Sequence, residues 1–181
     1  MRMTTTDEAL ATAAASGDRD AFATLLERCY DDLFRLTFRL TGRRAEAEDL
    51  TQDICASLPA KLAGFRAQSR FSTWLYRIAV NAAHDRRRRA ATRAKAAEGW
   101  GDWEISRRAD NEEKAEQMSW LTRTMTALPT DIRDTLALLI DGEMTHAQAG
   151  EVLQVSEGTI SWRMSEAKKR LRVLAQEEQS S

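Results

Sequence analysis

The chain has 181 residues, a formal net charge of -1, eight glycines and two prolines. This length suits one medium domain or two small ones. Few β-branched residues stand beside abundant Ala, Leu, Arg and Glu, which indicates an all-α fold. No apolar run approaches the roughly 18 residues that a membrane span needs, and the first residues lack the apolar core of a signal peptide. We therefore expect a cytoplasmic protein without membrane insertion.

The small net charge hides a strong segregation of charge along the chain. Residues 66–95 contain nine Lys or Arg residues and one acid, whereas residues 98–116 contain seven acids and three basic residues. A binding partner responds to such local fields rather than to the total charge.

The two cysteines, Cys29 and Cys55, each fall on an apolar stripe. We therefore expect buried thiols rather than a disulfide framework. No CxxC or HExxH spacing indicates a metal, and no cofactor is expected.

The N-terminal half is expected to contain a flexible segment followed by two helices. Residues 1–18 are polar and rich in Ala and Thr, so we expect them to be frayed or weakly helical. The first firm helix should begin near residues 18–20 and end at Gly42. The second should cover about residues 45–58, where Pro59 ends or bends it.

An acidic face marks this second helix. Glu46, Asp49 and Asp53 stand at i, i+3 and i+7, with Gln52 beside them. No histidine or glycine-rich loop accompanies these carboxylates, so acid–base chemistry or a metal site is disfavoured. We interpret the face as a docking surface for a protein, and an ordinary solvated face is the alternative.

The most distinctive stretch is an amphipathic helix over residues 70–89. Its apolar stripe recurs at helical spacing and consists of Phe71, Trp74, Leu75, Ile78, Ala79 and Ala82. We expect the remaining faces to carry Thr73, Tyr76, Arg77, Asn81 and His84, followed by the four arginines 86–89. Guanidinium groups neutralise phosphates and stack on bases, so this surface suits a polyanion. A solvated basic face is the alternative.

Residues 91–111 show no long apolar period and are expected to be a linker between domains. They contain Trp100 and Trp103, and a solvated linker does not require such large hydrophobic side chains. The sequence does not decide whether these two side chains dock on the protein itself or on a partner.

The C-terminal part is expected to form a helix-turn-helix. An apolar stripe from about residue 112 stops at Pro129, and Thr130 is expected to cap the next helix up to the break at residues 141–142. Thr145–Gln148 reads as a capping box for a short helix, and Ser156 should cap a long final one. We expect Gly158 to lie where these two helices cross.

In a helix-turn-helix the first half of the second helix enters the major groove. The exposed positions there are expected to be Glu157, Thr159, Ser161, Trp162, Arg163, Ser165 and Glu166, and Lys168 and the basic residues after it can reach phosphates. A plain helical hairpin with a basic tail is the alternative.

Three segments in this order resemble an extracytoplasmic-function sigma factor of bacterial RNA polymerase. They are AEDLTQDICASL, FRAQSRFSTWLYRIAVNAAHDRRRR and ALPTDIRDTLALLIDGEMTHAQAGEVLQVSEGTISWRMSEAKKRLR, and the resemblance runs from about Ala21 to Leu174. It implies two helical domains and no enzyme active site: region 2 over residues 19–90 and region 4 over residues 112–176, followed by a tail over residues 177–181.

The resemblance also implies partners and site residues. The docking block for the β′ clamp helices of the polymerase corresponds to Asp49, Leu50, Gln52 and Asp53. The residues that open and hold the -10 element of promoter DNA correspond to Arg66, Ser69, Arg70, Thr73, Tyr76, Arg77, Asn81 and Arg87. Region 4 should read the -35 element through Thr159, Ser161, Trp162, Arg163, Ser165 and Lys168, and should meet the β flap. Members of the family are often held inactive by an anti-sigma factor.

The chain departs from the family pattern in region 4. Ser161 and Trp162 stand where GTVKSR-type blocks carry a basic residue and a serine, and Glu166 stands where a basic residue is common. The -35 sequence is therefore not predicted. Gly150 replaces a typical alanine, which should weaken its helix by about 1 kcal/mol, and Pro59 interrupts the region 2 helix.

Two other classes of function are alternatives. A dimeric helix-turn-helix repressor or activator would bind duplex DNA without polymerase, but it leaves the acidic helix and the arginine-rich helix unexplained. An enzyme would have only the pair His84 and Asp85. Adjacent residues on a helix point about 100° apart, so this pair does not form an arm of a catalytic triad.

Overall fold

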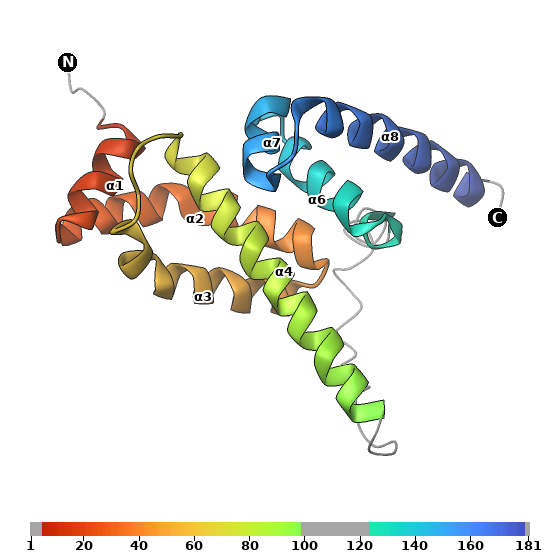
Figure 1. The fold of residues 1–181 in the computed structure, drawn as a ribbon, viewed down its shortest axis with the longest axis horizontal. Coiled ribbons are helices and arrows are strands. Elements are labelled where there is room, and N and C mark those ends of the chain that lie inside the picture. The colour runs from red at the N-terminus through yellow and green to blue at the C-terminus, as the bar shows by residue number, and fades with distance from the viewer. Residues whose placement is uncertain (1–4, 99–123, 180–181) are drawn as a thin grey trace.

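The computed structural model describes residues 5–98 and 124–179, and the described elements are all helices (Figure 1). The all-α prediction is confirmed. The helices are α1 (Asp7–Ala15), α2 (Arg19–Thr41), α3 (Arg44–Leu62), α4 (Phe71–Glu98), α6 (Thr130–Leu139), α7 (His146–Leu153) and α8 (Glu157–Gln179).

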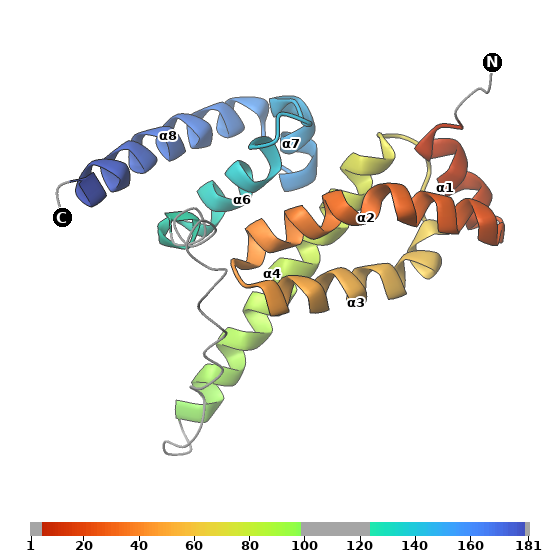
Figure 2. The same ribbon diagram turned by 180° about the vertical axis from the view of Figure 1, so that it is seen from behind.

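The helices pack as two units. In the N-terminal unit, α2 packs against α1, α3 and α4, and in the C-terminal unit α8 packs against α6 and α7. The units also contact each other, since α4 packs on α7 and α2 on α6. Figure 2 shows from behind how α2 lies across α4, while the end of α4 extends away from both units.

The expectation of a frayed segment before residue 18 is wrong for α1. Thr6 caps this helix by accepting a hydrogen bond from the Ala9 N–H at 3.2 Å. Leu10 and Ala11 are buried against the N-terminal unit. The Ala-rich sequence carries little amphipathic signal, so tertiary packing rather than local periodicity orders this helix.

Helix α2 agrees with the prediction at both ends. The Asp18 carboxylate accepts hydrogen bonds from the Asp20 and Ala21 N–H groups at 3.0 Å. Gly42 ends the helix in the left-handed region at φ 73°, which favours glycine. Between α2 and α3, the buried hydroxyls of Thr37 and Thr51 lie 2.7 Å apart and satisfy each other.

The expected end of α3 at Pro59 is wrong, because the helix continues to Leu62 with Pro59 inside it. Proline cannot donate the backbone hydrogen bond of an interior position. Leu58 and Leu62 are fully buried on either side of it. Their burial supplies the free energy that holds the last turn helical.

Helix α4 is longer than expected, since it continues past Arg89 to Glu98 and includes the start of the predicted linker. Ala, Arg and Lys dominate residues 90–98 and are strong helix formers without an apolar period. The predicted stripe is confirmed: Phe71, Leu75 and Ala79 are buried, and the other members pack against the core. Trp100 and Trp103 lie outside the described residues.

The helix-turn-helix is confirmed, including the capping box of α7. The Thr145 hydroxyl accepts from the Gln148 N–H, and the Gln148 side chain accepts from the Thr145 N–H at 2.8 Å. The Ser156 hydroxyl caps α8 by accepting from the Thr159 N–H at 3.1 Å. Two boundaries differ from expectation: Pro129 rather than Thr130 is the N-cap of α6, and α8 extends into the predicted tail to Gln179.

The close approach in this motif lies at Gly150, not at Gly158. A Cβ atom on Gly150 would lie 2.8 Å from the Val155 carbonyl oxygen, whereas one on Gly158 would meet only the Ser156 hydroxyl at 3.8 Å. The expectation that Gly150 merely weakens its helix is therefore wrong, because glycine is what lets the turn approach α7.

Both cysteines are free thiols, and their environments differ. Cys29 is buried, and burial raises its pKa to about 12, with the neighbouring Cys55 adding a smaller contribution. Cys55 is half-buried, and partial burial raises its pKa to a lesser extent.

None of the helices among residues 5–98 and 124–179 has the length and apolar content to cross a bilayer.

Replacing Gly150 tests the close approach. We expect Gly150→Ala to destabilise the protein by about 1–3 kcal/mol, because the new methyl group meets a backbone oxygen that cannot rotate away. Gly158→Ala is the matched control and should be neutral or stabilising by up to about 1 kcal/mol. Urea unfolding followed by circular dichroism measures both. Equal stabilisation by the two changes would contradict the packing at Gly150.

Thiol labelling tests the cysteine environments. We expect a thiol reagent at pH 8 to modify Cys55 first and Cys29 far more slowly, because the thiolate is the reactive form and Cys29 is both buried and harder to ionise. Peptide mapping by mass spectrometry identifies the labelled residue. In urea both should react at similar rates, and a fast native reaction of Cys29 would contradict its burial.

Candidate nucleic-acid interface

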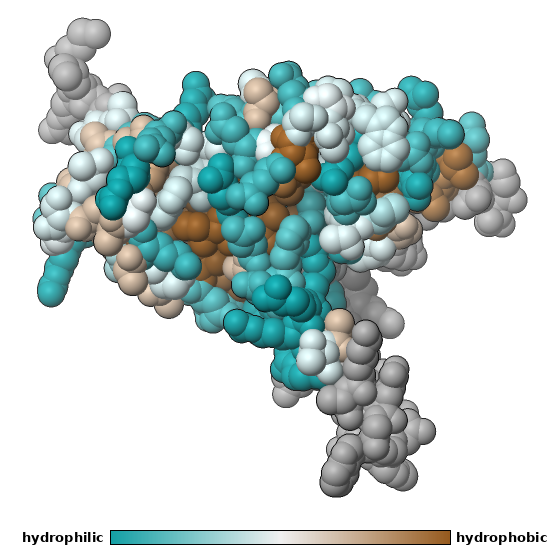
Figure 3. Space-filling model, in the orientation of Figure 1, coloured by the Kyte–Doolittle hydropathy of each residue, from teal (hydrophilic) through white to brown (hydrophobic). Residues whose placement is uncertain are grey.

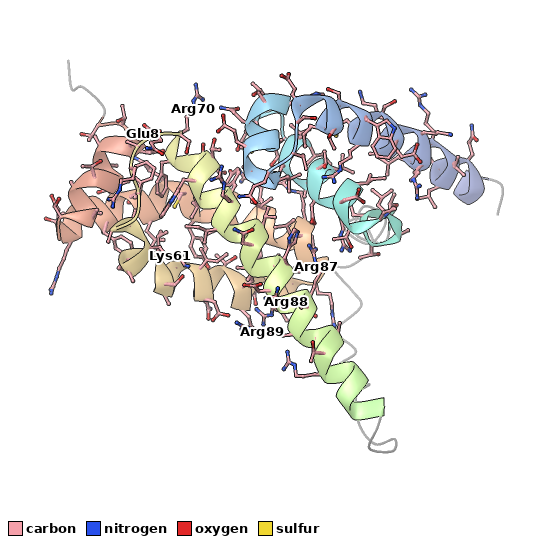
Figure 4. All side chains as sticks on the ribbon, viewed as in Figure 1. Glu8, Lys61, Arg70, Arg87, Arg88 and Arg89 are labelled. Atoms are coloured by element: carbon pink, nitrogen blue, oxygen red, sulfur yellow. The ribbon has the colours of Figure 1, made fainter. Side chains whose placement is uncertain are left out.

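The start of α4 is anchored by the N-terminal unit. The Phe71 N–H donates to the Glu8 carboxylate at 3.0 Å, and this hydrogen bond is the main cause of the lowered pKa of Glu8. The rings of Phe65 and Trp74 pack edge to face at 5.2 Å. A cap and an aromatic cluster therefore hold the preceding loop and the first turn of α4 together, with Arg70 labelled beside Glu8 in Figure 4.

Several predicted -10 residues are accessible. Arg66, Arg70 and Asn81 are exposed and Ser69 is half-buried. Arg66 donates to the Ala63 carbonyl at 3.1 Å across the loop. Arg66, Ser69 and Arg70 lie on the loop before α4, so one extended strand of nucleic acid could pass along them, whereas Asn81 lines the cleft between α3 and α4.

The expectation that Thr73 and Tyr76 are exposed is wrong in this structure. Both are buried, and the Tyr76 hydroxyl donates to the Glu143 carboxylate at 3.4 Å. Burial, followed by the nearby negative charge of Glu143, raises the pKa of Tyr76 well above its ordinary range. The C-terminal unit contacts Tyr76, and the helical period of α4 alone does not predict this second contact.

The other side chains on this side of α4 also bind the C-terminal unit. Arg77 donates to the Glu151 carbonyl at 2.8 Å. Arg87 forms two hydrogen bonds to Asp134, at 3.0 and 3.3 Å, and His84 Nε2 lies 2.6 Å from Asp134 Oδ2. We call the following residues the inter-unit face of α4: Tyr76, Arg77, His84 and Arg87.

The partners of this face carry negative charge. Asp134 on α6 is only 1 % exposed, and Asp141 and Glu143 lie in the turn before α7. Asp141 binds Arg39 of α2 at 2.5 Å. We call Asp134, Asp141 and Glu143 the acidic edge. Sequence analysis missed it, because no local pattern relates an aspartate to an arginine 47 residues away.

Positive charge surrounds the buried aspartate. Burial lowers the pKa of Arg133, and the like charge of Arg87 lowers it further. An open cleft of about 320 Å³ at this junction is lined in part by Arg86, Arg87, Arg93 and Arg133. Figure 4 shows Arg87 and Arg89 on different sides of α4, with Arg87 towards α6. The contact between α4 and α6 is therefore rich in positive charge, and the buried carboxylate of Asp134 pairs with Arg87 there.

The predicted docking residues on α3 do not all lie on the surface. Asp49 and Asp53 side chains are 67 % and 78 % exposed, and Gln52 is exposed. Leu50 is buried at 3 %, so it is a core residue of the unit. Arg86 of α4, which the sequence placed on the basic surface and not in the docking block, binds Asp49 at 3.2 Å and lies 3.8 Å from Asp53.

An open cleft of about 610 Å³ accompanies these acids between α3 and α4. Ile54 and Ile78 contribute apolar side chains to it, and Asp53, Arg86 and Arg89 contribute charge. Figure 3 shows the apolar patch in this hollow with hydrophilic side chains around it. An apolar floor with a charged rim is typical of a protein interface.

The recognition helix α8 presents part of the predicted set. Ser161, Ser165 and Lys168 are exposed, and Trp162 is 60 % exposed. Arg163 is instead turned towards α6, where its Nε lies 3.4 Å from Asp131. Thr159 is half-buried, and its hydroxyl bonds with the helix cap. Within the described residues, no group of His, Cys, Asp and Glu has a geometry that could hold a metal ion.

Comparisons with known proteins agree with this division. The family described as Sigma-70 region 2 matches residues 25–93, and the family described as Sigma-70, region 4 matches residues 125–173. The ECF RNA polymerase sigma factor SigM of Mycobacterium tuberculosis is 34 % identical over 166 residues, which cover 91 % of this chain and 82 % of SigM.

Solved structures share the fold. CnrH in complex with the cytosolic domain of CnrY superposes with a TM-score of 0.72 at 25 % identity, covering 94 % of this chain and 97 % of CnrH. The sigma factor RpoE in complex with the anti-sigma factor NepR from Bartonella quintana has a TM-score of 0.70 at 22 % identity, covering 86 % of this chain and 96 % of RpoE.

Proposed function

The chain belongs to the extracytoplasmic-function sigma factors of RNA polymerase, and from this premise we propose how its surfaces divide the work of initiation. A sigma factor of this family binds core polymerase and directs it to promoters, and it has no enzymatic activity of its own. Region 2 is proposed to run from residue 19 to residue 98, where α4 ends, and region 4 from residue 112 to residue 179, where α8 ends, with the linker between them.

Core polymerase is proposed to dock on α3 and the adjoining cleft. Asp49, Gln52 and Asp53 are exposed for contact with the β′ clamp helices, and Leu50 supports them from the core. Arg86 holds the two carboxylates before docking. The observation that carries the proposal is the position of this acidic surface beside the arginine-rich α4 on one unit, with a helix-turn-helix on the other.

Promoter DNA is proposed to contact both units. The loop and the first turns of α4 would hold the -10 strand through Arg66, Ser69, Arg70 and Asn81, joined by the inter-unit face of α4. The exposed side of α8 would read the -35 element through Ser161, Trp162, Ser165 and Lys168, and Arg163 would support the helix through Asp131. The surface of region 4 would also meet the β flap.

Control by an anti-sigma factor in the cytoplasm is proposed from the relatives. RpoE has been solved with the anti-sigma factor NepR, and CnrH with the cytosolic domain of CnrY. Polymerase acts in the cytoplasm, so the chain would work there. A partner that forms a stoichiometric complex and abolishes transcription supports this control, whereas full transcription from the saturated complex overturns it.

Reconstituted transcription tests the function as a whole. Core polymerase with and without the protein is incubated on a pool of randomised promoters, and the run-off transcripts are sequenced. Transcripts that depend on the protein and share -10 and -35 motifs support the proposal. Binding of duplex DNA by the protein alone, without such transcripts, would instead favour a helix-turn-helix repressor.

The docking surface predicts a separable defect in polymerase binding. We expect the double change Asp49→Ala and Asp53→Ala to weaken core binding about tenfold or more, because charged pairs at an interface steer and stabilise association. Both side chains are largely exposed, so the helical signal should remain. Asp31→Ala on α2 is the matched control. Fluorescence anisotropy with labelled protein measures affinity, and unchanged binding would remove the two acids from the interface.

The arginines of the inter-unit face of α4 predict a defect in promoter opening, a step that follows polymerase binding. We expect Arg77→Ala and Arg87→Ala to reduce promoter opening more than core binding, because their guanidinium groups are proposed to contact phosphates of the melted strand. Arg19→Ala, on an exposed turn of α2, serves as the control. Permanganate footprinting reports opening, and anisotropy reports core binding. An equal loss in both assays would argue against the assignment.

A further inference from the structure

The loop between α3 and α4, residues 63–70, has a conformation that its own sequence does not favour. Ala67 lies in the left-handed region at φ 52°, which a residue with a Cβ atom rarely adopts. Arg66, Ser69 and Arg70, which are proposed to hold the -10 strand, stand on either side of it. Such a loop keeps one shape only where its surroundings impose it, so the contacts at its two ends decide how these side chains are presented.

Aromatic side chains close the two ends of the loop. Phe65 is 8 % exposed and Phe71 is 1 % exposed, and their rings meet edge to face with centroids 5.8 Å apart. These ring contacts bring the ends together. They leave the backbone N–H groups at the start of α4 to other partners.

A carboxylate from another helix caps α4. The Trp74 N–H donates to the Arg70 carbonyl at 3.1 Å, so Arg70 occupies the N-cap position. An arginine side chain has no acceptor and cannot cap a helix as Ser, Thr, Asp or Asn do. The Glu8 carboxylate of α1 instead accepts the hydrogen bond of the Phe71 N–H, and its negative charge suits a helix N-terminus.

Glu8 also lies beside one of the proposed -10 residues. Figure 4 shows Glu8 and Arg70 next to each other at the start of α4. The Phe71 hydrogen bond is the main cause of the lowered pKa of Glu8, and the positive charge of Arg70 contributes to it. The ionised carboxylate therefore acts both on the first turn of α4 and on the cation at the end of the loop.

Helix α1 holds this carboxylate in place. Arg28 of α2 pairs with Asp7 at 3.0 Å and donates to the Thr5 carbonyl at 2.8 Å, and α1 also packs against α3 and α4. The match to Sigma-70 region 2 covers residues 25–93, so Glu8 lies outside it. The proposed -10 loop thus depends on a side chain that precedes the matched segment.

We propose that Glu8 is a positioning residue for the -10 strand: by capping α4 it holds the loop in one shape, so that Arg66, Ser69 and Arg70 are arranged before DNA arrives. Glu8 acts through the loop and touches no base in this role. A preformed loop loses less conformational freedom on binding than one that the DNA has to order. This inference rests on the function proposed above.

Three variants of the full chain test the cap. Glu8→Ala removes the acceptor, whereas Glu8→Gln keeps an acceptor oxygen at the same reach without the charge. Asp7→Ala is the matched control, because the partner of this neighbouring acid is Arg28 on α2. Glu8 is only half-buried, so its loss leaves the apolar core in place. Circular dichroism confirms that each variant is folded.

The first readout is taken on the free protein. Hydrogen exchange followed by mass spectrometry measures the protection of the amides in residues 63–74. We expect these amides to exchange roughly tenfold faster in Glu8→Ala and about twofold faster in Glu8→Gln, because a charged acceptor binds an N–H more strongly than a neutral one. Asp7→Ala should match the unaltered protein.

The second readout uses core polymerase and a promoter recovered from the randomised pool. Permanganate footprinting reports opening, anisotropy reports core binding, and competition with promoters changed at one -10 base reports base preference. We expect Glu8→Ala to reduce opening and base preference by about threefold to tenfold with core binding unchanged, because misplaced contacts bind the strand poorly. Glu8→Gln should restore most of the loss.

The outcomes separate this inference from the function it rests on. Unchanged exchange of residues 63–74 in Glu8→Ala would overturn the cap and leave the sigma-factor assignment intact. Faster exchange with unchanged opening and base preference would overturn the role of the cap in -10 binding. An equal loss in Asp7→Ala, or an equal loss of core binding and opening, would show general destabilisation and overturn it as well. No opening by the unaltered protein would overturn the proposed function together with this inference.

Discussion

A buried carboxylate, Asp134, lies at the centre of the described contact between α6 and α4. Asp134 is removed almost completely from water, which costs an isolated carboxylate several kcal/mol. The two hydrogen bonds from Arg87 and the contact with His84 offset that cost only while α6 lies against α4. The contacts of Asp134 therefore help to keep the C-terminal unit against α4, where Glu143 of that unit contacts Tyr76.

Helix α4 takes part in both the proposed polymerase surface and the proposed -10 surface. Its apolar stripe forms the core of the N-terminal unit, its inter-unit face contacts the C-terminal unit, and Arg86 reaches the acids of α3. A change in the contacts of this helix would therefore alter side-chain positions at both the proposed polymerase surface and the proposed -10 surface. Such sharing of one rigid helix provides a physical route by which docking and DNA binding could be linked.

Charged side chains make several of the described contacts at the edge of the interface between the two units. Arg39 binds Asp141, and Arg77 binds a main-chain oxygen of α7. Interfaces of this kind between domains resemble transient protein–protein contacts more than permanent ones. A sigma factor has to present its two units to separate promoter elements, and a contact of the transient kind suits that task.

The sequence by itself determined α2, the amphipathic part of α4, the helix-turn-helix with its capping box, and the family, because these depend on residues within a few turns of each other. The stripe from Phe71 to Ala79 and the caps at Asp18, Thr145 and Ser156 are local signals of this kind. The proposed DNA and polymerase contacts of individual residues remain predictions.

Only the tertiary structure decided which sides of these helices are free. It ordered α1 through packing, kept Pro59 inside α3, buried Tyr76 and Leu50, and turned Arg163 towards Asp131. It also paired Arg87 with an aspartate on another unit. A periodic pattern reports one buried face of a helix, whereas a helix packed from two sides, or a charge with a distant partner, depends on contacts between residues far apart in the chain.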